Sequence, residues 1–123
     1  MACLYFIPSS TNVKKLPIIS DNPLPKDDVI SLGSPKEQSN SITYGHVYGY
    51  KNVTIPNSSK SSSNVTFDVI YHDAFINKGS SGGPLLDSNL NVIGVNYASN
   101  SSGIGYAIPA VKVKEFLNKY VYR

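Results

Sequence analysis

The residues best suited to chemistry lie in one short run, residues 79–84, which read Gly-Ser-Ser-Gly-Gly-Pro. Small residues in such close succession before a strand predict a sharp backbone turn that leaves a hydroxyl exposed. Attack on a peptide carbonyl needs a hydroxyl presented in this way, with backbone N–H groups converging on the oxygen that becomes negative. We therefore interpret Ser81 as a candidate nucleophile and the N–H groups of Gly79 and Ser81 as a candidate oxyanion hole.

The elements that must position this turn are mostly strands. Short segments rich in β-branched and aromatic residues, separated by Pro, Gly, Asn and Ser, predict an all-β domain. After Pro109, apolar residues recur at helical spacing between lysines, which predicts one amphipathic C-terminal helix with Pro109 as its first residue. The predicted shape is a small antiparallel barrel or sandwich closed by a helix. The expected strands are residues 3–7, 17–20, 29–32, 41–50, 65–71, 84–86, 92–97 and 104–108.

Length and composition limit the remaining classes of protein. The chain has 123 residues, of which 41% are hydrophobic and 15% charged, which suits one folded domain. Its 11 basic and 8 acidic residues are scattered, so nucleic-acid binding gets little support. A single cysteine, Cys3, excludes an internal disulfide, and two histidines are too few for an ordinary zinc site, so we expect no metal and no cofactor.

The sequence also predicts no membrane span and no signal peptide. No apolar run approaches the roughly 18 residues that a membrane span needs, so we expect no membrane insertion. Nothing at the N-terminus has the layout of a signal peptide. The compartment stays open, because a chain without disulfides suits the cytoplasm and also suits secretion as part of a longer product.

With these elements in place, the sequence resembles a known family. Residues 73–86, which contain the Ser81 turn, are similar to the nucleophile segment of the HtrA (Deg) branch of trypsin-like serine proteases. Residues 92–96 resemble the strand that pairs with bound substrate, and residues 103–109 the strand that walls the specificity pocket. Upstream, residues 42–47 resemble the family's threonine-glycine hairpin, and residues 29–35 its strand that ends in glycine, a small residue and proline. Several segments in the right order make the resemblance specific, and it covers nearly the whole chain.

The resemblance implies a fold and an incomplete active site. The family's fold is two six-stranded antiparallel barrels, and this chain is similar to the second barrel only. Residues 1–8 are then an orphan strand of the preceding barrel, residues 9–108 the C-terminal barrel and residues 109–123 its closing helix. The triad His and Asp belong to the family's first barrel, so the resemblance implies that this chain lacks both.

The resemblance also implies a set of substrate-binding residues. Phe75, six positions before Ser81, corresponds to the floor of the specificity pocket, with Ile104 and Tyr106 nearby. Such an uncharged pocket is expected to prefer small or medium apolar side chains, or to be plugged. The other positions that the resemblance assigns to substrate binding are Val95, Asn96 and Gly105.

Three local side chains are candidates for the missing base. His72 precedes Ser81 by nine positions, at the entrance of the strand that leads into the turn, and we expect its ring to point away from Ser81. His46 lies in the hairpin that the family places elsewhere on the barrel, and Lys78 is typical of a solvated turn residue. We expect none of the three to act as the base.

The favoured function is the C-terminal, nucleophile-bearing half of an HtrA-like serine endopeptidase that is inactive alone, with a peptide or protein as substrate. The alternative is a non-catalytic pseudo-protease that binds extended peptides by strand addition, or binds a partner chain. A purely structural module ranks last. An orphan barrel exposes apolar surface, so we expect self-association or a first-barrel partner through that face, and no nucleic-acid partner.

Overall fold

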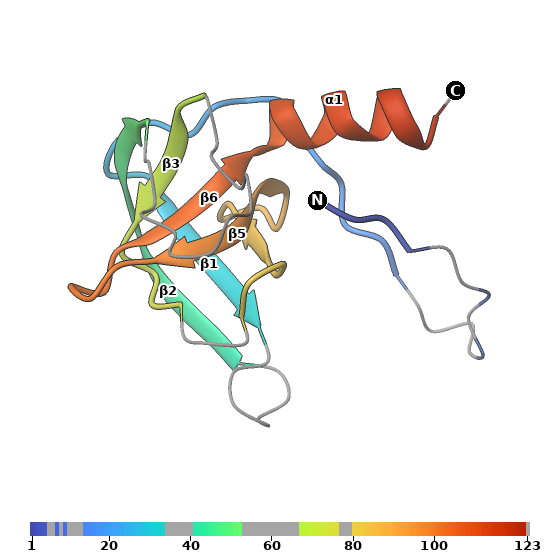
Figure 1. Cartoon of the computed structure of the whole chain (residues 1–123). Helices are drawn as coiled ribbons and strands as arrows, with labels where there is room; N and C mark the ends of the chain where they lie inside the picture. The colour runs from blue at the N-terminus through green and yellow to red at the C-terminus, as the bar shows by residue number, and fades with distance from the viewer. Residues whose placement is uncertain are drawn as a thin grey trace.

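The computed structural model describes residues 1–4, 7, 9, 14–33, 41–52, 67–76 and 80–122 of the chain. Within these residues, six strands form one closed antiparallel barrel, and a single helix follows the last strand (Figure 1). This confirms the predicted fold class, an all-β six-stranded barrel with a C-terminal helix. The elements are β1 (Asp28–Gly33), β2 (Ser41–Lys51), β3 (Val69–His72), β4 (Pro84–Leu86), β5 (Val92–Ser99), β6 (Gly105–Pro109) and α1 (Ala110–Tyr120).

The order of strands around the barrel is β1-β2-β3-β6-β5-β4, and every pairing is antiparallel. β1 closes the ring because it pairs with β2 on one side and with β4 on the other, where Ile30 lies opposite Leu86. β3 meets β6 through Ile70 and Ala107. Closure removes most of the free sheet edges that would otherwise pair with other chains.

The core draws at least one buried apolar residue from every strand. β2 shows the alternation that a half-buried strand requires, with Val47 inside while Tyr44 and Tyr48 are exposed. Fully burying one such Val, Leu or Ile side chain contributes about 1.5–3 kcal/mol, so these contacts are the main stabilising term of a domain this small. The core residues are Val29, Val47, Ile70, Ala74, Leu85, Ile93 and Ala107.

Several predicted element boundaries were wrong. Cys3, Leu4 and Ile7, the described part of the expected strand 3–7, are in no strand and are exposed, because no neighbouring strand in the described chain offers them a hydrogen-bond ladder. Residues 17–20 make only one isolated parallel bridge, between Ile18 and Val92. Pro109 ends β6 and precedes the helix with extended backbone, so the helix begins one residue later than predicted.

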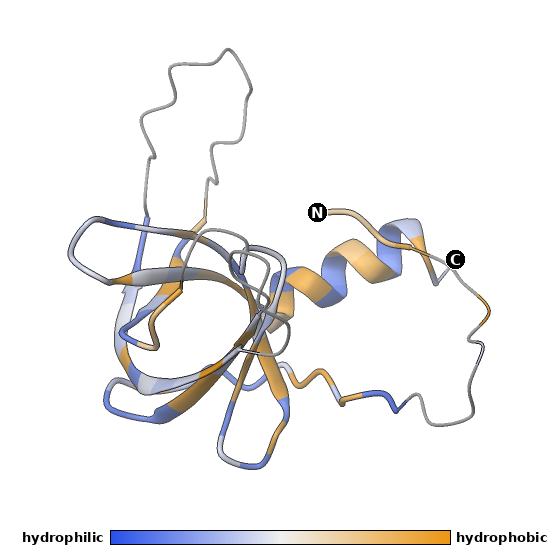
Figure 2. Ribbon diagram, turned by 90° about the horizontal axis from the view of Figure 1, so that it is seen from below, coloured by the Kyte–Doolittle hydropathy of each residue, from blue (hydrophilic) through white to orange (hydrophobic). Residues whose placement is uncertain are grey.

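The helix α1 projects from one end of the barrel, and the N-terminal residues lie beside it (Figure 1). Apolar and polar residues alternate in bands along it (Figure 2). Its first turns are anchored by Ala110 and Val113, which are buried, whereas Tyr120 near its end is exposed. In the part of the chain that the structure describes, no helix combines the length and the apolar character that crossing a membrane requires.

Candidate active site

Ser81 lies on a tight turn, residues 80–83, that leads into β4; we call it the nucleophile turn. Ser80 is buried, whereas Ser81 and Gly82 are exposed. Gly82 has a φ of 91°, in the left-handed region that favours glycine, so the sharpness of the turn accounts for the residue type there. The turn places the Ser81 hydroxyl at the protein surface.

Among the described residues, the Ser81 hydroxyl has one hydrogen-bond partner. Its Oγ donates a hydrogen bond of 3.2 Å to the main-chain carbonyl of Tyr97 on β5. The pairing of β5 with β6 shifts register between Asn96 and Ala98, so Tyr97 sits in a bulge, a device that redirects a strand next to many active sites. Burial raises the pKa of the Tyr97 phenol, whose oxygen is buried and has no partner among the described residues. Sequence reasoning missed Tyr97, because alternation of apolar and polar residues does not reveal a bulge.

The backbone of β5 holds the nucleophile turn on one side. The Gly82 N–H donates to the Asn96 carbonyl at 2.7 Å, and the Asn96 N–H donates to the Gly83 carbonyl at 2.9 Å. In its earlier part, as at Val95, β5 pairs with β4 on one side and with β6 on the other. At residues 97–99, β6 is the only strand paired with β5 in the described chain. Among the described residues, the stretch of β5 with an open side is therefore 97–99, whereas the resemblance assigned substrate pairing to residues 92–96.

A row of buried polar side chains crosses the interior of the barrel. His72 Nε2 and Asn96 Oδ1 are 2.9 Å apart, and Asn96 Nδ2 donates to Ser31 Oγ at 2.8 Å. We call these three side chains, from β3, β5 and β1, the interior hydrogen-bond network. Burial lowers the pKa of His72, against the opposing effects of the Asn96 hydrogen bond and the Asp73 charge. The neutral imidazole is therefore the form that the barrel favours.

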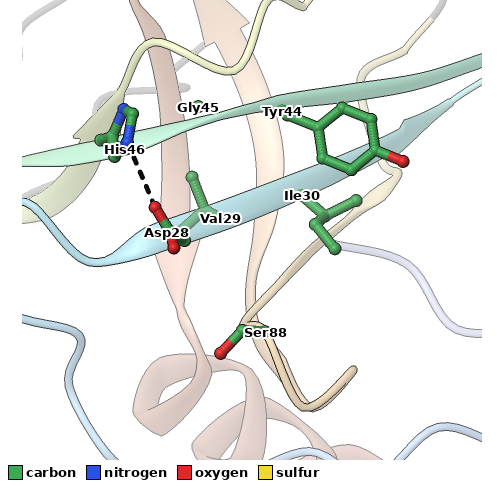
Figure 3. Close-up of a pocket in the computed structure, with 7 residues that line it drawn as sticks. All are labelled: Asp28, Val29, Ile30, Tyr44, Gly45, His46 and Ser88. Carbon is green, nitrogen blue, oxygen red and sulfur yellow. Dashed lines mark ion pairs between the residues drawn. The ribbon is translucent and has the colours of Figure 1, made fainter.

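The second histidine, His46, is engaged on the outer surface of β1 and β2. Its Nε2 lies 3.1 Å from Asp28 Oδ1, and more than half of each side chain is exposed (Figure 3). The pair lies at one side of an open hollow of about 410 Å³ that Ile30, Tyr44 and Ser88 also line (Figure 3). An ion pair this exposed contributes little to stability.

The start of the segment between β3 and the nucleophile turn is fixed by Asp73. Its Oδ1 accepts the His46 N–H at 2.6 Å, and its Oδ2 accepts the Tyr48 hydroxyl at 3.1 Å. The first of these hydrogen bonds is the main reason why the pKa of Asp73 is lowered, and the carboxylate in turn raises the pKa of Tyr48. Two residues later, the Phe75 carbonyl accepts the Thr43 hydroxyl at 2.8 Å. This segment is thus attached to β2 before the chain reaches Ser81.

The predicted substrate-binding residues lie in different environments. Phe75 is 54% exposed, whereas the next residue, Ile76, is buried. On β5, Val95 is half-buried and Asn96 is fully buried. Ile104 is half-buried before β6, and Gly105 and Tyr106 are buried on it. Gly79 and Lys78, the predicted oxyanion-hole residue and the weighed lysine, lie outside the described residues.

A hollow of about 340 Å³ opens beside Ser81. Val95 and Asn96 line it, and the other predicted substrate-binding residues do not. The sequence signal that could have found its far wall is the helical spacing of the apolar residues after Pro109, because that face of α1 forms the wall. The lining residues not assigned from sequence are Met1, Ala2, Cys3, Gly82, Tyr97, Ile108, Val113, Phe116 and Leu117.

This arrangement holds a serine hydroxyl on a constrained turn, and none of the described side chains bonds to it as a base. Ser81 bonds to a main-chain carbonyl, and both imidazoles are engaged elsewhere, His72 with Asn96 and His46 with Asp28. A hydroxyl becomes a strong nucleophile only when a base removes its proton. Among the described residues, no group of three His, Cys, Asp or Glu side chains is arranged to hold a metal ion.

The fold and the serine turn define a class of protein, and the sequence matches that class. Residues 1–95 match the trypsin-like peptidase domain, and the chain belongs to this family. Its relatives include the serine protease HTRA1 of Xenopus tropicalis, 37% identical over 84% of this chain and 23% of that protein. The serine protease HTRA3 of Homo sapiens is 34% identical over 87% of this chain and 24% of its own length. The expected similarity to the HtrA branch is thereby confirmed, and the chain spans about a quarter of the length of these relatives.

Solved structures agree with this assignment. The Rv3671c protease of M. tuberculosis in its active form superposes with a TM-score of 0.78 at 25% identity, over 92% of this chain and 51% of that one. The serine endoprotease from Yersinia pestis superposes with a TM-score of 0.67 at 28% identity, over 89% of this chain and 36% of that one. In both cases the match covers nearly all of this chain and a part of the solved protein.

Proposed function

We propose that this chain is the nucleophile-bearing C-terminal barrel of an HtrA-like serine endopeptidase, and that it does not hydrolyse peptides alone. The observation that carries this proposal is the state of Ser81. The residue is exposed on a constrained glycine turn, and among the described residues its hydroxyl bonds to a main-chain carbonyl. Serine proteases that have lost triad members keep only about 10³–10⁴-fold acceleration over water, which is too little for useful peptide cleavage.

Labelling of Ser81 by a fluorophosphonate, read by intact mass, tests this function. We expect the chain alone to stay unlabelled, because no side chain in the described part of the chain bonds to the hydroxyl as a base. Added imidazole is expected to act as the base, so that the native chain becomes labelled while Ser81→Ala stays unlabelled. The matched control is Ser88→Ala, which removes an exposed turn serine and should label as the native chain does.

Three outcomes would contradict the proposal, and one of them is that added imidazole brings about no labelling. Stoichiometric labelling without imidazole would show that a base from the chain reaches Ser81. Labelling that persists in Ser81→Ala would place the reactive group elsewhere.

The alternative function, peptide binding without cleavage, is supported by the open side of β5 at residues 97–99. Peptides that add a strand there would form main-chain hydrogen bonds and carry small or medium apolar side chains. Such a peptide should bind saturably, and its copy with N-methylated backbone amides should not. Saturable peptide binding by a chain that imidazole does not make reactive toward fluorophosphonate would favour the pseudo-protease over the incomplete enzyme.

We also infer that the surface around α1 contacts a partner, either a first barrel or a second copy of the chain. The end of α1 and the N-terminal residues expose several apolar side chains near one another, which is the property of an interaction surface. We call this the α1 surface, formed by the exposed side chains of Met1, Leu16, Tyr120 and Tyr122 and by the half-buried Leu117.

A further inference from the structure

The interior hydrogen-bond network lies among buried side chains that are mostly apolar. His72 and Asn96 are fully buried and Ser31 is 3% exposed, so all three polar side chains are removed from water. They join β3, β5 and β1, three strands that surround the core. Burying polar groups costs free energy unless they bond to one another, so a network in this place needs a reason.

The hydrogen bonds fix the state of the imidazole. Asn96 Nδ2 donates one hydrogen bond to Ser31 Oγ and its Oδ1 faces the ring, so in this arrangement His72 Nε2 is the donor to Asn96. The other ring nitrogen, Nδ1, is then an acceptor, and it is buried with no partner among the described residues. A second proton on Nδ1 would put an unpaired donor and a positive charge into the core.

The same asparagine also holds the nucleophile turn. The main chain of Asn96 bonds to Gly82 at 2.7 Å and to Gly83 at 2.9 Å, the two residues that directly follow Ser81. The orientation of the Asn96 side chain and the position of its main chain are coupled, because both belong to one residue in the middle of a strand. A change at the ring of His72 can therefore reach Ser81 through a single residue.

We propose that His72 is a positioning residue for the nucleophile turn, acting through Asn96, and that protonation of its ring releases that turn. It is not a catalytic residue, because it contacts neither Ser81 nor, in the proposed site, the substrate. The inference rests on the proposed function only in taking Ser81 as the nucleophile. The coupling between the His72 ring and the nucleophile turn can be measured without any enzymatic activity.

The surroundings of the ring favour this role. The Asp73 carboxylate, from the segment after β3, favours the protonated form of the ring, whereas burial of the ring opposes it. From β2, β5 and β6 the ring has uncharged neighbours, the cross-strand residue Val47, Asn96 and Gly105. A Cβ at Gly105 would lie 2.8 Å from the ring Cε1 and 2.5 Å from Ile76 Cδ1, so the ring has little room to turn away from Asn96.

Backbone amide NMR of the whole chain tests the coupling. The imidazole signals of His72 are followed with pH, together with the amide signals of Gly82 and Gly83. We expect the two glycine signals to move with the titration of His72, below its ordinary pKa of 6.5. In His72→Gln, which keeps a donor of similar reach and does not titrate, the glycine signals should be flat over the same pH range.

Hydrogen exchange supplies the second measurement. His72→Leu removes the donor to Asn96, and we expect exchange of the Gly82 amide to rise roughly tenfold more than that of β2 amides, the size expected when one buried hydrogen bond is lost. The matched control is Val29→Ala, which loosens the core without touching the network and should raise exchange uniformly. If His72→Leu fails to fold, the pH profile of His72→Gln decides alone.

The outcomes separate cleanly. Glycine signals that titrate unchanged in His72→Gln would overturn the proposal, as would His72 titrating while both glycine signals stay still. If His72→Leu and Val29→Ala gave the same exchange pattern, His72 would be a packing residue of the core and not a positioning residue for the turn. Failure of imidazole rescue at Ser81 would instead count against the proposed function and would leave these signals unaffected.

Discussion

At the scale of single residues, polar side chains decide how the segment before Ser81 is held. Asp73 accepts a backbone N–H from His46 and the Tyr48 hydroxyl, which joins that segment to β2. His72, one residue earlier, bonds inward to Asn96. Two adjacent residues thus connect the same segment to the surface and to the interior.

Replacing Asp73 with Asn should lower the free energy of unfolding by about 1 kcal/mol at neutral pH, because a partly exposed charge-assisted hydrogen bond is weakened. The pKa of Asp73 lies below its ordinary value of 3.8, so this stabilisation is present above pH 3.8 and is lost as pH falls through the lower folded pKa. The measurement is urea unfolding of both proteins at pH 7 and at about pH 2.

The matched control is Asp28→Asn, whose exposed ion pair with His46 should change stability by less than about 0.5 kcal/mol. An Asp73→Asn effect that is equally large at both pH values would show that the charge of Asp73 is not its source.

The serine turn could be predicted from sequence, and its partners could not. The spacing of Ser81 between small residues is local, and a local pattern can be recognised in one sequence. Asn96 lies 24 positions from His72 and 65 from Ser31, and only closure of the barrel brings the three together. Tyr97 was missed for the same reason, because a bulge depends on how two strands meet.

At the scale of elements, the barrel depends on a very short strand. β4 has three residues, yet it joins β1 to β5 and begins directly after the nucleophile turn. Its residue Leu85 is fully buried in the core. A loss of packing at this strand should therefore affect both the closure of the ring and the position of Ser81.

Leu85→Ala should cost about 3 kcal/mol of unfolding free energy, because it removes buried methyl groups and leaves a cavity. That is a large share of the roughly 5–15 kcal/mol available to a domain. Leu90→Ala, in the exposed turn after β4, is the control and should change stability by less than about 0.5 kcal/mol. Thermal unfolding measures both, and equal effects would mean that β4 does not carry the core.

Every strand of the barrel corresponds to a segment predicted from alternation and turn residues, although several ends were misplaced. β5 continues to Ser99, two residues beyond the predicted end, because β6 supplies partners there. The segment 17–20 has strand-like residues, but only Ile18 finds a partner, in Val92. Propensity describes which residues suit a strand, and the neighbours decide which of them form one.

At the scale of the whole molecule, exposed aromatic side chains occur in two separate places. The α1 surface carries exposed Tyr120 and Tyr122 at one end, while the outer face of β2 exposes Tyr44 beside the His46–Asp28 pair (Figure 3). A small domain with exposed aromatic residues at one end is suited to a contact with a partner there.

If the α1 surface is the contact, Tyr120→Glu should weaken association at least tenfold, because a charge would enter an apolar interface. Sedimentation of the chain over a range of concentrations measures self-association, alone and with an added first barrel of an HtrA relative. Tyr44→Glu, on β2, is the control and should associate as the native chain does. Equal weakening of association by both variants would exclude the α1 surface as the contact. So would a native chain that stays monomeric both alone and with the added first barrel.

The closed ring of strands also determines how the chain must reach its native state. Ile70 pairs with Ala107 across 37 positions (107 minus 70), and Ile30 pairs with Leu86 across 56 (86 minus 30). Contacts between such distant parts of a chain form only after much chain entropy has been lost, and barrels of this kind fold in milliseconds to seconds. While the ring is open, β1 and β4 each have an unpaired edge, so the time before closure is when the protein is most exposed to aggregation.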